Sequence, residues 1–336
     1  MSNWSALAEQ VLGGNPISAD DARDIVRSSD DDLLPLLGAA FQIRQHFHGR
    51  DVRLHVLQNA KSGKCPEDCA FCSQSSRYNT GVDSYRMQTV DELVEGARHA
   101  HSMGAVKYCM VTATRGPSAR DLDTICEAVR RIKSEMNINV CTSLGLLKDG
   151  QAEQLAQAGV TRFNHNLESS KRFYPELCGT HTWDDRVATV KRARAAGLEA
   201  CCGGIMGMGE TEDDRISLAF ELQALEVESI PVNFLDPRPG TPMGDNERLA
   251  PMDCLRLLAM FRFVNPSRDI RVAGGREVNL RHLQALALWP ANSIFAAAKR
   301  SGLFLVTLGS SNDAFHIGSA FATSISCDFS LAMKSA

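Results

Sequence analysis

The 336-residue chain lacks the sequence features that mark membrane, secreted and nucleic-acid-binding proteins. No apolar run approaches the roughly 18 residues that a membrane-spanning helix needs. There is no run of basic residues and the formal net charge is −4, so neither nucleic acid nor an anionic membrane is expected as the main partner. The first residues, MSNWSALAEQVLGG, contain neither the basic nor the apolar segment of a signal peptide. These absences together predict a cytoplasmic protein.

Cysteine, by contrast, is abundant, with 11 residues in the chain. An odd number in a reducing compartment argues against structural disulfides and favours metal ligation or catalysis for some of these residues. Cys126 and Cys254 lie in apolar helical patterns and are interpreted as small core residues. Cys178 and Cys327 have no evident partners in the sequence, so we assign them no role.

The pattern of strands and helices predicts an α/β fold. Residues 1–50 are interpreted as helical, with Ser18 capping a helix. From about residue 53, β-rich runs alternate with helical patterns, and the eight strand candidates are residues 53–60, 106–114, 138–145, 160–168, 198–207, 229–236, 270–275 and 292–295. An open doubly wound sheet and a closed (β/α)8 TIM-type barrel both fit this alternation. The count of eight favours the barrel.

The expected organisation has three parts. An N-terminal helical extension (1–50) precedes the barrel (51–295), and an atypical C-terminal tail (296–336) follows it. The 41 residues of the tail contain only five charged side chains. We expect this tail to be poorly ordered or, at best, to form an atypical cap over the side of the barrel where the eighth strand lies.

Three cysteines in the segment KCPEDCAFCS lie on the loop directly after the first predicted strand. In a barrel, such loops carry the functional residues. Cys65, Cys69 and Cys72 have no fourth cysteine nearby, and no second C-x-x-C or H-x-x-x-H pair exists to complete a structural zinc site. Three thiolates around a cubane iron–sulfur cluster leave one iron open to a small molecule. A zinc site or chance clustering is the alternative.

A second set of cysteines lies on the predicted strands themselves. Cys109, Cys141 and Cys201 or Cys202 occur on neighbouring strands, where inward side chains converge on the barrel axis. Strand alternation allows only one of Cys201 and Cys202 to face inward, and the face that it shares with Gly203 and Ile205 favours Cys201. Arg271, on the seventh predicted strand, needs an anionic partner if it is buried. Three thiolates and this arginine could hold a smaller cluster, and a salt bridge is the alternative.

Polar residues at the ends of other predicted strands are suited to binding a small molecule. Asn164, Asn166 and Glu168 share one face of the fourth strand, opposite Phe163 and His165, and suit a ribose or a polar headgroup. His165 is interpreted either as a core histidine or as a functional one. Asn233 ends the sixth strand, and Arg186 could bind a carboxylate in a bidentate manner.

These motifs together resemble a known family. The spacing C-x-x-x-C-x-x-C after the first strand is typical of radical S-adenosylmethionine enzymes. The segments CPEDCAFCSQSSRYNTG, FNHNLE, THTWDDR, CCGGIMGMGET, IPVNFL and GGREVNLR, in this order over about residues 35 to 295, closely resemble the biotin synthase family.

The resemblance implies a sulfurtransferase that inserts sulfur between C6 and C9 of dethiobiotin. A 4Fe-4S cluster would bind S-adenosylmethionine and generate a 5′-deoxyadenosyl radical, and a 2Fe-2S cluster would supply the sulfur. By resemblance, the 4Fe-4S ligands are Cys65, Cys69 and Cys72, and the 2Fe-2S ligands are Cys109, Cys141, Cys201 and Arg271. The residues expected to bind S-adenosylmethionine are Phe71, Asn166, Glu168, Arg186 and Ile205, and those expected to contact dethiobiotin are Asn166 and Asn233.

The resemblance also implies partners and leaves two alternatives. An electron donor such as flavodoxin or ferredoxin and a homodimeric assembly are expected. One alternative is another radical S-adenosylmethionine enzyme of the same subgroup, such as a hydrogenase-maturation or methylornithine-synthase type. The other is a non-catalytic iron–sulfur paralogue.

Overall fold

The computed structural model describes residues 3–297, and within them a single parallel sheet closes into a barrel. The strands are β1 (Arg53–Lys61), β2 (Lys107–Thr112), β3 (Asn139–Ser143), β4 (Arg162–Asn164), β5 (Glu199–Cys201), β6 (Gly204–Met206), β7 (Ser229–Phe234), β8 (Asp269–Val272) and β9 (Ser293–Ala297). Strand β9 pairs with both β8 and β1, while β5 and β6 together bridge β4 and β7. The predicted (β/α)8 barrel is confirmed.

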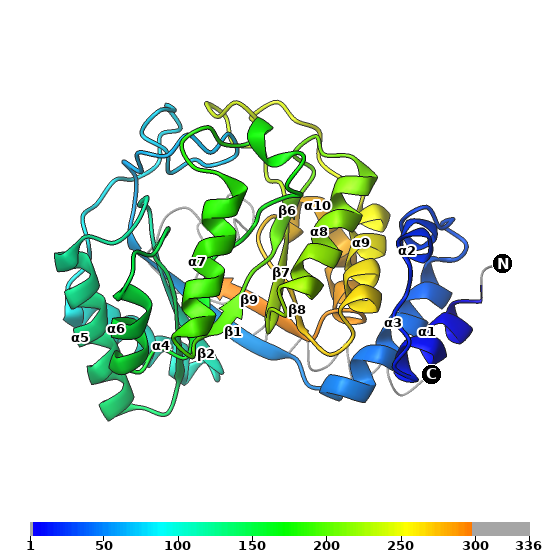
Figure 1. The fold of residues 1–336 in the computed structure, drawn as a ribbon, viewed down its shortest axis with the longest axis horizontal. Coiled ribbons are helices and arrows are strands. Elements are labelled where there is room, and N and C mark those ends of the chain that lie inside the picture. The colour runs from blue at the N-terminus through cyan, green and yellow to red at the C-terminus, as the bar shows by residue number, and fades with distance from the viewer. Residues whose placement is uncertain (1–2, 298–336) are drawn as a thin grey trace.

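Helices follow the strands and cover the outside of the barrel (Figure 1). They are α4 (Val90–Ser102), α5 (Ala119–Glu135), α6 (Gln151–Ala158), α7 (Trp183–Ala195), α8 (Glu212–Ala224), α9 (Pro251–Val264) and α10 (Arg276–Leu280), with the 3-10 segments η1 (Tyr174–Glu176) and η2 (Arg281–Leu288). Four of these helices begin at a side-chain cap, whose hydroxyl oxygen accepts a backbone N–H of the first turn. The caps are Thr89 for α4, Ser118 for α5, Thr182 for α7 and Thr211 for α8. These caps fix where each loop ends and each helix begins.

The fifth predicted strand (198–207) is interrupted. Strand β5 ends at Cys201 and β6 begins at Gly204, with Gly203 between them. A side chain at Gly203 would place its Cβ 2.0 Å from the carbonyl oxygen of Pro231 on β7. Only glycine allows the two backbones to approach this closely, and the interruption lies beside the cavity of the barrel.

The fourth strand is shorter than predicted. Strand β4 ends at Asn164, four residues before the expected end, and Glu168 has the left-handed backbone angle φ of 71°. Side chains alternate between two faces only while the backbone is extended. His165 is among the residues that line the cavity with Asn164 and Asn166, and its ring lies beside that of Phe163, with 6.2 Å between the ring centroids.

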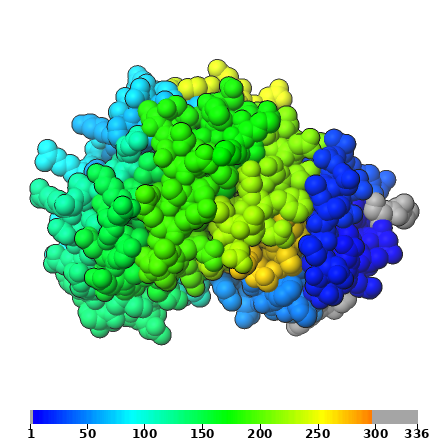
Figure 2. All heavy atoms as spheres, in the orientation of Figure 1, coloured from blue at the N-terminus to red at the C-terminus, as the bar shows by residue number. Residues whose placement is uncertain are grey.

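The N-terminal segment forms helices α1 (Trp4–Leu12), α2 (Ala19–Val26) and α3 (Leu33–His48) on one side of the barrel (Figures 1 and 2). Helix α2 packs against α8 and α9, α3 packs against α9, and α1 packs on α3. The predicted cap at Ser18 is confirmed, because its Oγ accepts the N–H of Asp21 at 3.1 Å and the carboxylate of Asp21 accepts the N–H of Ser18 at 2.8 Å. Buried apolar side chains of this segment, such as Ile25 and Leu36, join the core between α8, α9 and the sheet.

Within residues 3–297, none of the helices combines the length and the apolar character that crossing a bilayer demands. The tail expected at 296–336 lies outside the described residues from residue 298 on, and so does Cys327.

Candidate active site

A cavity of about 360 Å³ opens at the carboxyl ends of the strands. It has the size of a small-molecule site. Its walls include the loop after β1, strand β2, the segment after β4, the start of α7, strand β6 and the end of β7. Together they contribute ten of the predicted residues: Cys65, Cys69, Phe71, Cys72, Cys109, Asn166, Glu168, Arg186, Ile205 and Asn233. Cys141, Cys201 and Arg271 lie beneath it, almost fully buried in the lumen.

The loop after β1 holds its three cysteines in a compact turn. The N–H of Cys72 donates to the carbonyl of Cys69 at 3.0 Å, and Cys65 pairs through its backbone with Gln74 and Ser76 at 3.0 and 2.8 Å. Cys65 and Cys69 are buried, and Cys72 is partly buried. Burial raises the pKa of Cys72 to about 11. Thiols with raised pKa values keep their protons until an iron centre displaces them, and the protons then leave to the solvent.

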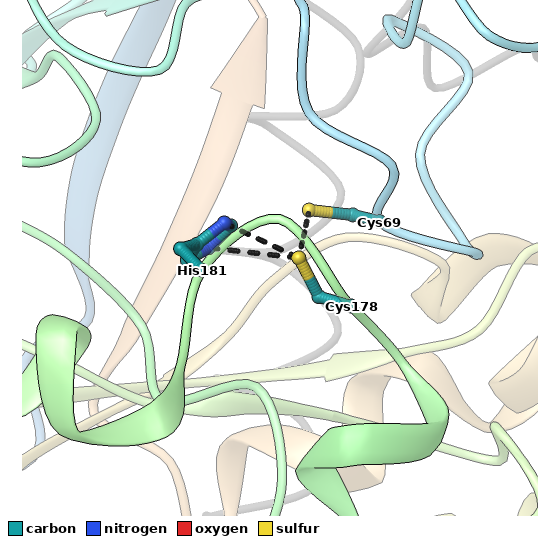
Figure 3. Close-up of side chains that lie close together, drawn as sticks. All are labelled: Cys69, Cys178 and His181. Carbon is teal, nitrogen blue, oxygen red and sulfur yellow. Dashed lines mark hydrogen bonds between the residues drawn. The ribbon is translucent and has the colours of Figure 1, made fainter.

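Cys178, to which the sequence analysis assigned no role, lies beside this loop. The thiol of Cys69 donates to Sγ of Cys178 at 3.8 Å, and Nδ1 of His181 lies 3.2 Å from the same sulfur (Figure 3). These hydrogen bonds, from Cys69 first and then from His181, lower the pKa of Cys178 to about 4. The sequence could not reveal this contact, because 109 residues separate the two cysteines.

Glu168 and Arg186 form a buried ion pair in the wall of the cavity. Nη1 of Arg186 lies 3.5 Å from Oε1 of Glu168, and its Nε donates to the hydroxyl of Tyr174 at 2.6 Å. Burial acts to lower the pKa of Arg186, yet Glu168 and Tyr174 raise it above the ordinary value. Burial raises the pKa of Glu168, against the lowering effect of Arg186. Asn166 donates to Oε2 of Glu168 at 3.3 Å, so that its amide and the carboxylate face the cavity as one polar group.

The amide of Asn233 ties two strands together at the cavity wall. Its Nδ2 donates to the carbonyl of Gly204 at 3.0 Å, and its Oδ1 accepts the N–H of Gly274 at 2.9 Å. Two other side-chain amides in the wall each have one atom without a hydrogen-bond partner among the described residues. These buried atoms are Nδ2 of Asn59 and Oδ1 of Asn164. Buried polar atoms in this condition favour a polar ligand.

The lumen cysteines lie on β2, β3 and β5, and β4 separates the last two of these strands. Cys109 and Cys141 are direct partners in the ladder between β2 and β3. A hydrogen bond from Cys109 lowers the pKa of Cys141 to about 7. Cys201 faces the same space, since Nη1 of Arg271 donates to its Sγ at 3.4 Å. Cys202 instead packs in the apolar core between sheet and helices.

Arg271 is 1% exposed and its guanidinium is held from one side. Nη2 lies 2.7 Å from Oδ2 of Asp269, 2.9 Å from Oγ of Ser229 and 3.4 Å from Nε2 of His55. Nε has no partner among the described residues. The salt bridge that the sequence left as the alternative is thus present together with the contact to Cys201, and Nη1 remains directed at the thiols.

A layer of ion pairs lies around Asp269 at the amino-terminal side of these cysteines. Arg162 donates to Asp269 at 3.1 Å and to Glu199 at 2.7 Å, and Lys107 also binds Glu199, at 3.0 Å. Together with Arg271 these five side chains carry three positive and two negative charges. The surplus positive charge suits a site of anionic sulfur ligands.

Both sites fit iron–sulfur clusters by the chemistry of their donors. Soft thiolates are the ligands that such clusters require. The loop after β1 supplies three thiols at the cavity, and the lumen supplies three thiols with the partnerless Nε and the thiol-directed Nη1 of Arg271.

Comparison with known proteins agrees with this geometry. Residues 60–222 match the model of the Radical SAM superfamily, and residues 231–317 match that of the Biotin and Thiamin Synthesis associated domain. Among solved structures, the fold resembles methylornithine synthase, with a TM-score of 0.78 and 21% identity over 88% of both chains. It also resembles a hydrogenase maturase from Carboxydothermus hydrogenoformans, with a TM-score of 0.76 and 17% identity over 90% of this chain and 72% of that chain. The barrel and its three-cysteine loop therefore define a radical S-adenosylmethionine protein.

Curated relatives give the narrower assignment. A biotin synthase from Salinibacter ruber is 57% identical over 295 residues, which are 88% of this chain and 82% of the relative. A biotin synthase from Bacillus subtilis is 47% identical over 309 residues, 92% of this chain and 91% of the relative. The chain belongs to the biotin synthase family.

Proposed function

We propose that this protein is a sulfurtransferase that converts dethiobiotin to biotin by inserting sulfur between C6 and C9. The observation that carries the proposal is the presence of two separate thiol sets along one barrel axis. Cys65, Cys69 and Cys72 lie at the open end, and Cys109, Cys141 and Cys201 lie in the lumen with Arg271. A radical source and a sulfur source on opposite sides of one substrate require this arrangement.

At the open end, the three cysteines would hold a 4Fe-4S cluster. With S-adenosylmethionine bound, this centre supplies the 5′-deoxyadenosyl radical that removes hydrogen from the substrate. The Glu168 carboxylate and the Asn166 amide, which share a hydrogen bond at the cavity wall, would bind the ribose hydroxyls. Arg186 beside them would bind the carboxylate of the cofactor. Phe71 and Ile205, which pack in one apolar cluster at the mouth, would contact the adenine.

The substrate would lie in the cavity between the two sites. A cyclic urea presents one carbonyl acceptor and two N–H donors, and amides supply both complementary groups. Asn166 and Asn233 are the amides that the family resemblance points to, and the partnerless Asn59 and Asn164 extend this set. The surrounding wall keeps water from the reacting carbons, since a carbon radical must form where its target already lies in contact.

In the lumen, Cys109, Cys141, Cys201 and Arg271 would hold the 2Fe-2S cluster that donates sulfur. Nη2 of Arg271 contacts three protein groups, on Asp269, Ser229 and His55. Nη1 would therefore be the guanidinium atom that faces the cluster. Burial lowers the pKa of His55, and the charge of Arg271 lowers it further. His55 thus stays neutral, with Nε2 as an acceptor toward the guanidinium.

The proposal extends to the setting of the enzyme. We place it in a reducing cytoplasm, as a homodimer that receives electrons from a flavodoxin or a ferredoxin. We also retain the division into an extension (1–50), a barrel (51–295) and a tail (296–336).

Anaerobic reconstitution with iron and sulfide tests the proposal. The expected result is one 4Fe-4S and one 2Fe-2S centre per chain by iron and sulfide analysis and Mössbauer spectroscopy. Incubation with dethiobiotin, S-adenosylmethionine and a reductant should then yield biotin by mass spectrometry. A chain that holds only the 4Fe-4S centre would exclude sulfur insertion from a lumen cluster. A chain with both centres and no biotin would favour another substrate or a non-catalytic role.

A further inference from the structure

Cys69, Cys178 and His181 form a compact group of metal-binding side chains next to the proposed 4Fe-4S site. Cys69 comes from the loop after β1, whereas Cys178 and His181 come from the loop that precedes α7 (Figure 3). One ligand atom from each lies within 4.8 Å of the other two, and all three residues are buried. No role in the proposed reaction uses Cys178 or His181.

Two distances in this group are close to the edges of a tetrahedral metal site. Zinc–sulfur bonds of about 2.3 Å at tetrahedral angles separate two sulfur ligands by about 3.8 Å, and a sulfur and an imidazole nitrogen by about 3.6 Å. The sulfur atoms of Cys69 and Cys178 are 3.8 Å apart, and Nδ1 of His181 is 3.2 Å from the sulfur of Cys178. Two thiolates and an imidazole are a common donor set for Zn²⁺ and other thiophilic divalent cations.

A carboxylate completes the surroundings of this group. Oε2 of Glu67 contacts Nδ1 of His181. The carboxylate of Glu67 is itself fixed, because Oε1 accepts from Arg115 at 3.0 Å and Oε2 accepts from Thr180 at 2.7 Å. It is placed to serve as a fourth, oxygen ligand, because a metal on Nδ1 of His181 would replace the proton shared with Glu67.

The two loops are joined independently of any ligand. The N–H of Ala70 donates to the carbonyl of Leu177 at 2.8 Å. Oδ1 of Asp68 accepts the N–H groups of Gly179 and Thr180, each at 3.0 Å. A cation would therefore meet a preformed site and would not have to order two separate loops.

We propose that Cys69, Cys178 and His181 bind one thiophilic divalent cation, with Zn²⁺ as the expected occupant, when the 4Fe-4S cluster is absent. This inference rests on the proposed function in one respect, the assignment of Cys69 to the cluster. Binding uses both cysteines as thiolates and releases any thiol protons to the buffer. Because Cys69 would serve both sites, the two occupancies exclude each other. Zn²⁺ at this site then blocks cluster assembly.

Cobalt(II) alone is the probe for the site, added anaerobically to the cluster-free full chain under a thiol-free reductant. The parent protein carries Cys65→Ala and Cys72→Ala, so that no 4Fe-4S site remains. We expect one tightly bound Co²⁺ with the intense visible bands of a tetrahedral thiolate complex. Adding Cys178→Ala or His181→Gln should weaken this binding by more than tenfold, whereas the control Cys126→Ala should leave it unchanged. Equal Co²⁺ spectra and affinities in the parent and in both site variants would overturn the proposal.

A competition measurement tests the exclusion with the cysteine loop intact. One equivalent of Zn²⁺ added before reconstitution should lower the 4Fe-4S content of the unaltered chain, measured by iron, sulfide and absorbance. The Cys178→Ala chain should assemble its cluster with or without Zn²⁺. Equal inhibition of both chains would place the metal on Cys65, Cys69 and Cys72 and would refute the role of Cys178. A chain that forms no 4Fe-4S cluster even without Zn²⁺ would instead count against the proposed function, and the Co²⁺ result would stand by itself.

Discussion

Replacement of Asp269 by asparagine gives a direct test of how the lumen is held together. Its Oδ2 accepts hydrogen bonds from Arg162 at 3.1 Å and from Arg271 at 2.7 Å. Its Oδ1 accepts from Asn292 at 3.0 Å and from Ser293 at 2.5 Å. Although burial acts to raise it, the pKa of Asp269 lies well below its ordinary value, chiefly because of Arg271. The Asp269→Asn variant therefore removes the charge that two buried guanidinium groups face.

The magnitude follows from these contacts. A hydrogen bond to a charged group is worth about 1.5–3 kcal/mol, and removing one partner of a buried ion pair costs about 3–5 kcal/mol. Asparagine has nearly the same shape as aspartate but turns one acceptor into a donor toward the arginines. We expect the variant to lose about 4 kcal/mol of unfolding free energy. It should also retain less 2Fe-2S cluster, because Arg271 loses its closest contact.

Urea unfolding of the cluster-free full chain measures the first effect, and reconstitution followed by Mössbauer spectroscopy measures the second. The matched control is Asp184→Asn, whose partner Lys171 is 2.8 Å away but whose ion pair is exposed, with 66% and 60% of the two side chains accessible. Such a pair contributes less than about 1 kcal/mol. Equal losses in the two variants would refute the reasoning that the lumen depends on its buried carboxylate.

Three further outcomes are expected. Cys201→Ala should abolish the 2Fe-2S signal after reconstitution, whereas Cys202→Ala should keep it and lose only about 1 kcal/mol of stability; the reverse result would exclude Cys201 as the ligand. Glu168→Gln should weaken binding of S-adenosylmethionine to the cluster-loaded protein by roughly 10- to 150-fold in equilibrium dialysis, and unchanged affinity would remove Glu168 from the cofactor site. Because the pKa of Asp269 is lower in the folded chain than in the unfolded chain, its ionised carboxylate stabilises the fold at pH values above the unfolded-state pKa of about 3.9. This stabilisation is lost progressively as the pH falls below that value. The difference in unfolding free energy between the unaltered chain and Asp269→Asn should therefore stay constant from about pH 7 to pH 5 and shrink below about pH 4, and a difference that grew on acidification would contradict this assignment.

The alternation of strands and helices, together with the count of eight units, was sufficient to predict the barrel. Strand-like and helical stretches recur eight times, and parallel strands joined by helices have few ways to close. The helix starts were equally local, since Thr182 and Thr211 cap the helices that follow them within three residues. The interruption between Cys201 and Gly204 was not predictable from local pattern, because it arises from the approach of Pro231 on another strand.

In the candidate site, too, some features were predictable from the sequence and others required the folded barrel. The spacing of Cys65, Cys69 and Cys72 is a property of one loop and is visible in the sequence. The amides Asn59 and Asn164 lie on predicted strands, but only the closed barrel shows that each has a polar atom without a partner.

The amino-acid sequence was enough to predict the fold class, the three-cysteine loop and the set of strand residues that could face the lumen. These features depend on spacing along one segment or on the two-residue period of a strand. Only the folded barrel shows which distant side chains meet. It placed Cys201 against Arg271, Asp269 between two arginines, and Cys178 beside Cys69. Contacts of this kind follow from barrel closure and loop packing, which no local pattern of residues encodes.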